Sequence, residues 1–437
     1  MGKKGLMITS SPGAGREASR RGHPIRRAVI VIIAAAGVSV LAAVIMIWFA
    51  GITGSVLWTV VAGLLAALLA SLIIGLLLRR DVFGPLMVFG LAALFSLTWL
   101  YPGFRSVRPD PVAGIEWVTR PDGSRLALHV TRASAPTEPP MIAVHGGPGV
   151  ADMAHDAPAF AALATDRDVY VYDRVGTGAS TRLADPTGYT TARGVQDLEA
   201  VRVHTGASRV VLHGHSWGIL IVAAYAQEHP DRVAALVLSA PGELPLDGAQ
   251  PVPGDLTTRL DGGQKAQLYL RLMRPRNLFT YALTSADARV AHSLAGDREM
   301  DRRFGLIYRE STRALFCDAH LVDRVGSTSL GYYAHYVPQL HPDPADEPLD
   351  LQRLAMIKAP VLVIKPACDY LPWSSLPGYQ RAFPQSQFVM VPGAGHVAYL
   401  EQPAPYISLV NSFLAAQRLP LPTIDANTVP EGYHGTQ

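Results

Sequence analysis

Three long apolar runs in the first quarter of the chain restrict what it can fold into. Residues 28–50, 55–78 and 82–101 contain no charged side chain. About 20 apolar residues span the hydrocarbon core of a bilayer. The first run is too long for the apolar part of a signal peptide, and two more follow it. The sequence therefore predicts three transmembrane helices within residues 28–102.

Basic residues predict how this region lies in a membrane. Seven Lys and Arg residues precede the first run, in a Gly- and Ser-rich segment (residues 1–27) that we expect to be disordered. Lys and Arg concentrate on the cytoplasmic side of membrane helices. With the N-terminus inside, three spans place the rest of the chain on the extracytoplasmic side of the cell membrane. Arg105 and Arg108, after the third run, favour the opposite orientation weakly.

Composition excludes several other classes of protein. The formal net charge is only +3, and the basic residues form no stripe interleaved with aromatics, so nucleic-acid binding is not expected. No CxxC, HExxH or P-loop pattern occurs, and the chain has two cysteines. We expect neither a metal ion nor an organic cofactor. The sequence does not predict an oligomeric state.

After residue 113, short apolar segments alternate with helical patterns, which is typical of an α/β domain. Residues 113–243 form the first part of the predicted core and residues 352–417 the second part. Between them, residues 244–351 are helix-like and mixed in polarity, which predicts a helical lid. Residues 418–437 are expected to be a flexible tail. The predicted fold is a mostly parallel sheet with helices on both faces, and reacting groups collect at the carboxyl ends of its strands.

Ser216 has the strongest sequence signal for catalysis. It lies in Gly214-His215-Ser216-Trp217-Gly218, between a predicted strand and a predicted helix. This is the pattern of a nucleophile elbow, whose flanking glycines allow a sharp turn. Serine needs a base to take its proton. The sequence therefore predicts that Ser216 is a catalytic nucleophile and that a histidine and an acid lie nearby.

His396 and Asp369 are the predicted base and acid. Each follows a late predicted strand, and their order after Ser216 matches the order nucleophile, acid, base. Asp318 and Asp323 in the lid are rival acids. Other histidines compete less well because they do not follow the final strand: His145, His204, His213, His215 and His341.

The turn His145-Gly146-Gly147-Pro148-Gly149 directly follows a short apolar strand. Its glycines leave backbone N–H groups free to point into a cleft, where they can hold a developing oxyanion. We predict that the N–H groups of Gly147 and Trp217 form the oxyanion hole. Gly146 is the close alternative to Gly147.

HGGPG, the run Asp173-Arg174-Val175-Gly176-Thr177-Gly178, GHSWG and the Asp369/His396 pair together resemble the proline iminopeptidase family of α/β-hydrolases. The resemblance covers residues 113–417 and implies a serine aminopeptidase. Two motifs depart from the family pattern: DRVG stands where DQRG is usual, and His215 stands where Gly is usual. The membrane region is no part of the pattern.

The resemblance also implies acidic residues, contributed largely by the lid, that hold the free amino group of the substrate. Glu243, Glu299 and Glu310 are the candidates, and each could equally be a solvated surface charge. Cys317 lies in the lid and Cys368 adjoins Asp369. They could form a disulfide outside the cell, and two free thiols are equally compatible with the sequence.

Taken together, the residues predict a membrane-anchored serine hydrolase. The first hypothesis is an aminopeptidase that releases N-terminal residues, such as proline, from short peptides. The second is an esterase, lipase or lactonase that uses the same triad on a small ester. A third, a non-enzymatic binding module anchored in membrane lipid, is disfavoured by the complete set of catalytic residues.

Overall fold

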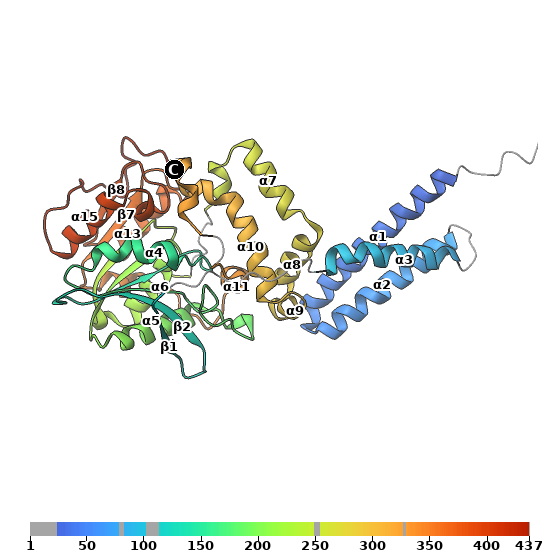
Figure 1. Ribbon diagram of the computed structural model, residues 1–437, viewed down its shortest axis with the longest axis horizontal. Coiled ribbons are helices and arrows are strands. Elements are labelled where there is room, and N and C mark those ends of the chain that lie inside the picture. The colour runs from blue at the N-terminus through green and yellow to red at the C-terminus, as the bar shows by residue number, and fades with distance from the viewer. Residues whose placement is uncertain (1–23, 78–82, 102–112, 249–253, 327–328, 437) are drawn as a thin grey trace, which may run out of the picture. The chain divides into compact units, whose positions relative to one another are not determined.

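The computed structural model describes residues 24–77, 83–101, 113–248, 254–326 and 329–436. The chain divides into two compact units, Met1–Tyr101 and Pro102–Gln437. The predicted disordered segment lies largely outside the described residues, and its last four residues begin helix α1. Figure 1 shows the elements of both units in chain order.

The first unit consists of the apolar helices α1 (Pro24–Thr53), α2 (Val56–Leu77) and α3 (Phe83–Leu100). Two of them, over Ile25–Thr53 and Val56–Leu77, are long and apolar enough to cross a membrane. The prediction of three spans was therefore wrong in number. The apolar stretch of α3 within the described residues, Gly84–Leu100, is shorter than the other two.

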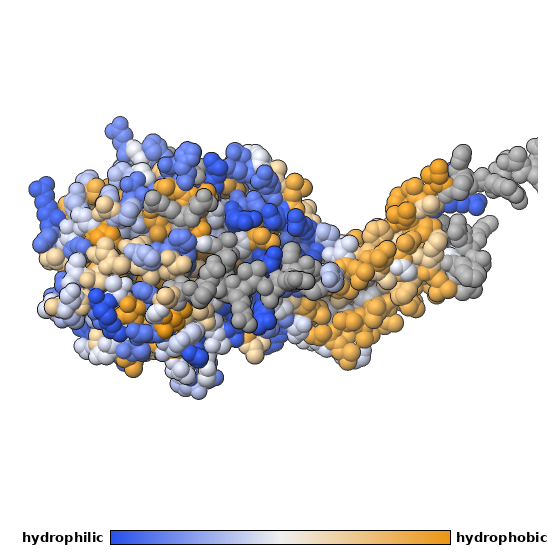
Figure 2. All heavy atoms as spheres, viewed as in Figure 1, coloured by the Kyte–Doolittle hydropathy of each residue, from blue (hydrophilic) through white to orange (hydrophobic). Residues whose placement is uncertain are grey.

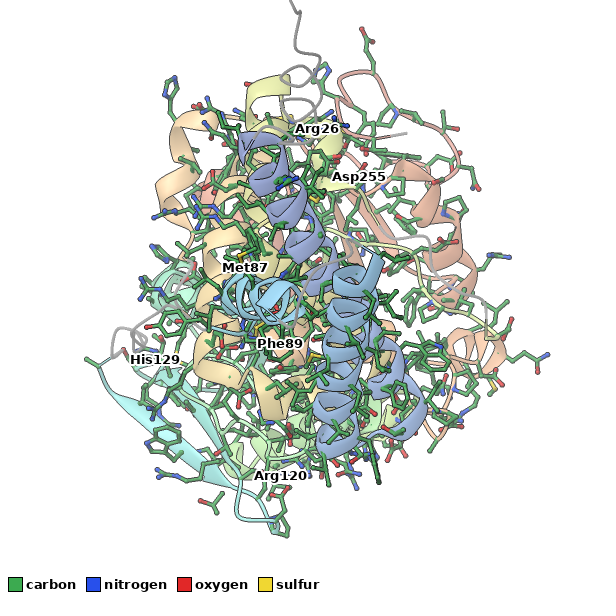
Figure 3. All side chains as sticks on the ribbon, turned by 90° about the vertical axis from the view of Figure 1, so that its right-hand side faces the viewer. Arg26, Met87, Phe89, Arg120, His129 and Asp255 are labelled. Carbon is green, nitrogen blue, oxygen red and sulfur yellow. A yellow bond between two sulfur atoms is a disulfide. The ribbon has the colours of Figure 1, made fainter. Side chains whose placement is uncertain are left out.

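Helices α1 and α3 pack together through small side chains, among them Ala35 and Ala92. Ser39 and Ser96 lie 3.1 Å apart between their hydroxyl oxygens. Large apolar side chains such as Leu68 and Leu94 remain exposed. Figure 2 shows apolar residues over most of the visible surface of these helices, and Figure 3 labels Met87 and Phe89 on α3. A helix that is apolar on all sides suits a lipid environment.

The second unit is built on an eight-stranded sheet of order β1-β2-β4-β3-β5-β6-β7-β8. The first two strands form an antiparallel hairpin, and β2 pairs antiparallel with β4. All later pairs are parallel. The strands are β1 (Ile115–Thr119), β2 (Arg125–Thr131), β3 (Met141–Val144), β4 (Val169–Tyr172), β5 (Val210–His215), β6 (Val233–Ser239), β7 (Val361–Pro366) and β8 (Gln387–Val391).

Helices cover both faces of this sheet, as predicted. On one face, side chains of α4 and α15 join alternate residues of the central strands in one apolar core. On the other face α5 and α6 pack together, α6 lying on β3, β5 and β6. The helices of the core are α4 (Met153–Phe160), α5 (Thr191–Thr205), α6 (Gly218–Glu228), α12 (Leu351–Ala355), α13 (Leu376–Ala382), α14 (Ala398–Glu401) and α15 (Pro403–Leu414), with short 3-10 helices η1 (Ala161–Leu163), η2 (Pro186–Gly188), η3 (Pro230–Arg232) and η7 (Trp373–Ser375).

The lid is inserted between β6 and β7 and is helical, as predicted. It opens with a 3-10 turn, and α7 then begins at a capping box in which Asp261 and Gln264 bond to each other's backbone N–H. Its elements are η4 (Leu256–Arg259), α7 (Gly262–Leu272), α8 (Pro275–Ala286), α9 (Ala288–Leu294), α10 (Asp297–Ser311), η5 (Thr312–Leu315), η6 (Ala319–Arg324) and α11 (Tyr332–Leu340).

The C-terminal segment differs from its prediction. Instead of extending as a flexible tail, residues 418–436 pack against the core. The N–H of Ile424 donates to the carbonyl of Phe388 in β8 (2.9 Å), and the N–H of Thr436 donates to the carbonyl of Asp369 (3.0 Å). Pro- and Gly-rich composition suggested disorder, but these long-range backbone bonds are invisible in composition.

Cys317 and Cys368 form a disulfide, with their Cα atoms 5.4 Å apart. The bond joins the end of the lid to the loop after β7. Of the two possibilities that the sequence left open, the structure contains the disulfide.

Candidate active site

Ser216 occupies a sharp turn between β5 and α6. Its backbone φ is +52°, a strained left-handed conformation for a residue with a side chain. The Ser216 N–H donates to the carbonyl of Ser239 in β6 (2.8 Å), which anchors the turn. A Cβ at Gly218 would lie 2.4 Å from the carbonyl oxygen of Val144, so this position needs glycine. The turn thus presents Ser216 at the end of the sheet, as the elbow motif predicts.

His396 and Asp369 meet at the same edge of the sheet. The Nδ1 of His396 lies 2.9 Å from Oδ1 of Asp369, and the Asp369 side chain is fully buried. Burial alone would raise the pKa of Asp369, but Lys365 and His396 outweigh it and hold that pKa well below its usual range. The carboxylate is therefore ionised and accepts from Nδ1–H, which leaves Nε2 of His396 free to accept a proton.

The alternative candidates for the catalytic acid and base make other contacts. Asp318 caps a turn by accepting from the N–H of His320, and the side chain of Asp323 lies outside the described residues. His215 lines the same cavity as His396, with 4.8 Å between their ring centres, but burial and then His396 lower its pKa well below the usual value. The other histidines contact Arg174 (His145), Glu116 (His204), Tyr406 (His213) and Thr284 (His341).

The turn after β3 lies directly beside the nucleophile. A Cβ on Gly146 would be 2.8 Å from Cβ of Ser216 and 2.9 Å from the carbonyl oxygen of His215. Within the described part of the chain, the N–H groups of Gly146, Gly147 and Trp217 have no hydrogen-bond acceptor. Unpaired N–H groups beside a nucleophile can stabilise an oxyanion. The geometry is compatible with both Gly147 and Gly146 as donors.

Arg174 connects the two halves of this candidate oxyanion hole, a role that the motif comparison missed. Its guanidinium donates to the carbonyl of Pro148 (3.1 Å) and lies over the ring of Trp217, 4.7 Å from the centroid. Its N–H donates to Nε2 of His145 (3.2 Å). Burial, and then Arg174, lower the pKa of His145 to about 3, so a neutral imidazole holds the turn.

Tyr370 is a second residue that the sequence analysis missed. Its ring packs on His396, with 4.6 Å between centroids, and it lines the same cavity as Ser216. Its position directly after Asp369, at the end of a parallel strand, was the signal that could have identified it.

The nucleophile, the candidate base and part of the glycine turn line one cavity of about 280 Å³. Ser216, His396, Tyr370 and Gly146 come from the sheet side. The lid contributes mainly apolar side chains, from η4 (Leu256), α7 (Leu268, Leu272), α10 (Phe304, Ile307) and η5 (Leu315). Tyr308, Tyr336 and His335 are its more polar members. The cavity therefore offers a reactive wall and an apolar wall.

The predicted lid carboxylates do not line this cavity. Glu299 is ion-paired with Arg276 (2.9 Å) and Arg303 (2.7 Å), and Glu310 is ion-paired with Arg271. Glu243 is absent from the cavity wall as well. The sequence shows only that these residues are acidic. It therefore could not distinguish a carboxylate that forms an ion pair in the lid from one that binds substrate. Their role in substrate binding stays a prediction that the geometry does not favour.

Two aspartates of the core line the cavity instead. Asp152 precedes α4, and its carboxylate bonds to His155 (2.8 Å) and to the N–H of Gly326 (2.6 Å). Asp156 lies one turn later and accepts from the Tyr399 hydroxyl (2.9 Å) through Oδ1. Burial, and next the charge of Asp152, raise the pKa of Asp156 well above its usual value. A buried carboxylate with an available oxygen favours a cationic partner.

In the part of the chain that the structure describes, no group of three or more His, Cys, Asp or Glu side chains could hold a metal ion.

Comparison with known proteins agrees with the fold. Residues 139–403 match the family model of the alpha/beta hydrolase fold, so the chain belongs to that family and is a hydrolase. It is similar to the proline iminopeptidase of Heyndrickxia coagulans, 37% identical over 102 residues. That match covers 23% of this chain and only 35% of the relative.

A probable proline iminopeptidase of Leptolyngbya boryana is 25% identical over 287 residues, which cover 62% of this chain and 84% of the relative. Among solved structures, an esterase of Thermogutta terrifontis is 22% identical, with a TM-score of 0.49 and coverage of 70% and 99%. The proline iminopeptidase of Mycobacterium smegmatis is also 22% identical, with a TM-score of 0.43 and coverage of 69% and 98%.

Proposed function

We propose that this protein is a serine aminopeptidase of the proline iminopeptidase type, attached to a membrane. One observation carries the proposal: a nucleophile elbow with its histidine and a buried carboxylate, Asp156, line the same cavity. A cavity of about 280 Å³ suits the first residue of a peptide rather than a long chain. The named relatives support the same activity.

In the proposed mechanism, Oγ of Ser216 attacks the carbonyl carbon of the first peptide bond and passes its proton to Nε2 of His396. The carbonyl oxygen becomes an oxyanion that the N–H groups of Trp217 and Gly147 stabilise. His396 then gives the proton to the leaving amine, and an acyl-enzyme remains. Water, deprotonated by His396, releases the N-terminal amino acid. Asp369 orients the imidazole and stabilises its charged form throughout.

Asp156 is the proposed partner of the substrate's free amino group. The ammonium would replace solvent at the carboxylate oxygen that does not bond to Tyr399. A charge-assisted bond in a buried site fixes the direction of the substrate, so that its first carbonyl faces Ser216. Asp152, one turn away, adds negative charge to the same end of the cavity.

An esterase is the second candidate, favoured by the apolar lid wall. Leu268, Leu272 and Ile307 would accept the acyl chain of an ester as well as an amino-acid side chain. The same three catalytic residues serve both reactions, so substrate recognition must distinguish them.

A substrate panel tests the proposal. Proline and alanine arylamides are compared with short acyl esters, using full-length protein and the Ser216→Ala variant. We expect arylamide hydrolysis that Ser216→Ala abolishes. Ester turnover without arylamide turnover would contradict the peptidase, and activity unchanged in Ser216→Ala would contradict both enzymes.

We further propose that α1 and α2 anchor the protein in membrane lipid and that the hydrolase domain is extracytoplasmic. Two crossings leave both flanks of the helix pair on one side of the membrane, so this placement also puts the basic N-terminal segment outside, against the preference of Lys and Arg for the cytoplasm. The extracytoplasmic side therefore rests on the disulfide alone, because disulfides persist in oxidising compartments. Digestion of the domain by protease added to intact cells is the expected result. Protection that disappears on lysis would contradict this placement.

A further inference from the structure

Lys365 is a buried lysine that the proposed mechanism does not use. It lies in β7, four residues before Asp369, and its side chain is 1% exposed. A lysine ammonium is strongly hydrated, and burying it costs several kcal/mol unless the protein replaces the lost water. The surroundings of this side chain therefore need a specific explanation.

The protein replaces that water with three oxygens. Nζ of Lys365 donates to Oδ2 of Asp369 (3.3 Å) and to the carbonyl oxygens of Leu371 (2.7 Å) and Pro372 (3.3 Å). These three acceptors match the three N–H donors of an ammonium. Burial lowers the pKa of Lys365, and the charge of Asp369 opposes that change. These groups thus form a complete site for a charged lysine.

The carboxylate of Asp369 is divided between two partners. Oδ1 accepts from His396 (2.9 Å) and from the N–H of Leu371 (3.2 Å), while Oδ2 faces Lys365. A carboxylate held at both oxygens cannot rotate about its χ2 bond. The Nδ1 of His396 therefore meets a fixed acceptor, and the imidazole keeps one orientation.

The C-terminal strap, residues 430–436, covers this ion pair. The ring centre of Tyr433 lies 6.0 Å from Nζ of Lys365, and the Tyr433 hydroxyl donates to the carbonyl of Thr436 (2.7 Å). The N–H of His434 donates to the carbonyl of Ala367 (2.7 Å), and that of Thr436 to Asp369 (3.0 Å). The strap is therefore hydrogen-bonded to the loop after β7 at two points, Ala367 and Asp369.

We propose that Lys365, covered by the C-terminal strap, is a positioning residue for catalysis that acts through Asp369. It holds Oδ2, so that Oδ1 stays directed at His396 while the imidazole gains and loses its proton. The inference rests on the proposed catalytic role of Asp369. It is independent of whether the substrate is an amide or an ester.

The test replaces Lys365 with methionine, which keeps the length of the side chain and removes its charge. Lys358→Met is the matched control, because Lys358 is exposed seven residues earlier. Full-length proteins in detergent are assayed for kcat, KM, melting temperature and the rate of Ser216 labelling by a fluorophosphonate. We expect Lys365→Met to lower kcat and labelling about tenfold, the lower end of the effect of supporting groups at other polar sites. KM and the control should stay within about twofold.

A double-mutant cycle separates positioning from a purely structural role. If Lys365 acts through Asp369, Lys365→Met causes no further loss of kcat in the Asp369→Asn background. The same fractional loss in both backgrounds would overturn the inference, as would wild-type kcat and labelling in a folded Lys365→Met single variant. If wild-type protein is not labelled at all, the proposed serine hydrolase fails instead.

If Lys365→Met does not fold, Tyr433→Ala tests the positioning role of Lys365 instead. Tyr433 is partly exposed, so its loss leaves the core intact but opens the ion pair to water. We expect kcat to fall about threefold with KM unchanged, since water weakens the ion pair. An unchanged kcat in a folded Tyr433→Ala variant would overturn the inference.

Discussion

The two walls of the cavity differ in chemistry and in origin. The sheet wall comes from the ends of β3, β5, β7 and β8 and carries Ser216, His396 and unpaired backbone N–H groups. The lid wall comes from one inserted segment and is mostly aliphatic and aromatic. Asp156 belongs to the sheet wall, on the helix that follows β3.

This difference assigns separate tasks to the walls. Groups on strand ends are fixed by the backbone hydrogen bonds of the sheet, which suits a reaction that needs exact geometry. Apolar lid side chains offer contact area without direction, so they select by size and shape. Changes in the sheet wall should therefore alter kcat or remove a specific polar contact, whereas changes in the lid wall should alter selectivity modestly.

Among the substitutions that test the difference between the two walls, Gly146→Ala is expected to have the largest effect on kcat. A Cβ in Gly146→Ala would meet Ser216 and His215 at under 3 Å and push the turn away from the nucleophile. We expect kcat to fall roughly 100- to 1000-fold, as on loss of an oxyanion donor, with little change in KM. Gly263→Ala on α7, where the nearest atom is 3.4 Å away, should leave kcat unchanged. A near-normal kcat for a folded Gly146→Ala variant would contradict the proposed oxyanion hole.

An intermediate effect is expected at Asp156. Asp156→Asn should raise KM for a free-amine arylamide about 10- to 100-fold, the value of a hydrogen bond to a charged group. KM for an acyl ester should not change. Asp231→Asn, at an exposed aspartate, is the control. Equal effects on both substrates would mean that Asp156 supports the fold and does not bind an amine.

The same carboxylate predicts a pH dependence. Burial and then Asp152 raise the pKa of Asp156, Asp173 acts in the same direction, and Tyr399 and His155 oppose them. A raised pKa keeps this carboxyl neutral further up the pH scale, and a neutral carboxyl does not attract an ammonium. KM for the amine substrate should therefore fall as pH rises through that pKa, in wild type but not in Asp156→Asn. The ester serves as the internal control, because its KM should not follow this titration.

The smallest effect is expected on the lid wall. Leu272 faces the cavity on α7, while Leu270 on the same helix is 73% exposed. Leu272→Ala should lower kcat/KM for substrates with large apolar side chains by about tenfold or less, and barely affect small ones. Leu270→Ala should change neither. A uniform loss for all substrates in Leu272→Ala would show that the lid wall also positions the reacting atoms.

The sequence predicted the parts of this molecule that local patterns encode. The elbow at Ser216 depends on a strand, a helix and two glycines within a few residues. The meeting of Asp369 with His396 could be predicted because each follows a strand and their order is characteristic. The helical lid followed from a break in the alternating pattern.

The remaining features depend on contacts between distant segments. Asp156 looks like any helical aspartate until α4 is packed beside the cavity, and Glu299 looks like a binding residue until Arg276 and Arg303 surround it. Lys365 is an unusual polar residue in a buried strand, but its partners come from the following loop and the C-terminal strap. In the first unit, composition identified the apolar helices, and only their observed lengths reduced three spans to two.

The most direct test of the central claim compares proline arylamide with its N-acetylated counterpart on the wild-type, full-length protein. The two substrates share the scissile amide and differ in the charge at the amino group. An aminopeptidase that binds the ammonium at Asp156 should show a kcat/KM about 100-fold higher for the free amine. Equal values, or faster hydrolysis of the acetylated substrate, would contradict the account.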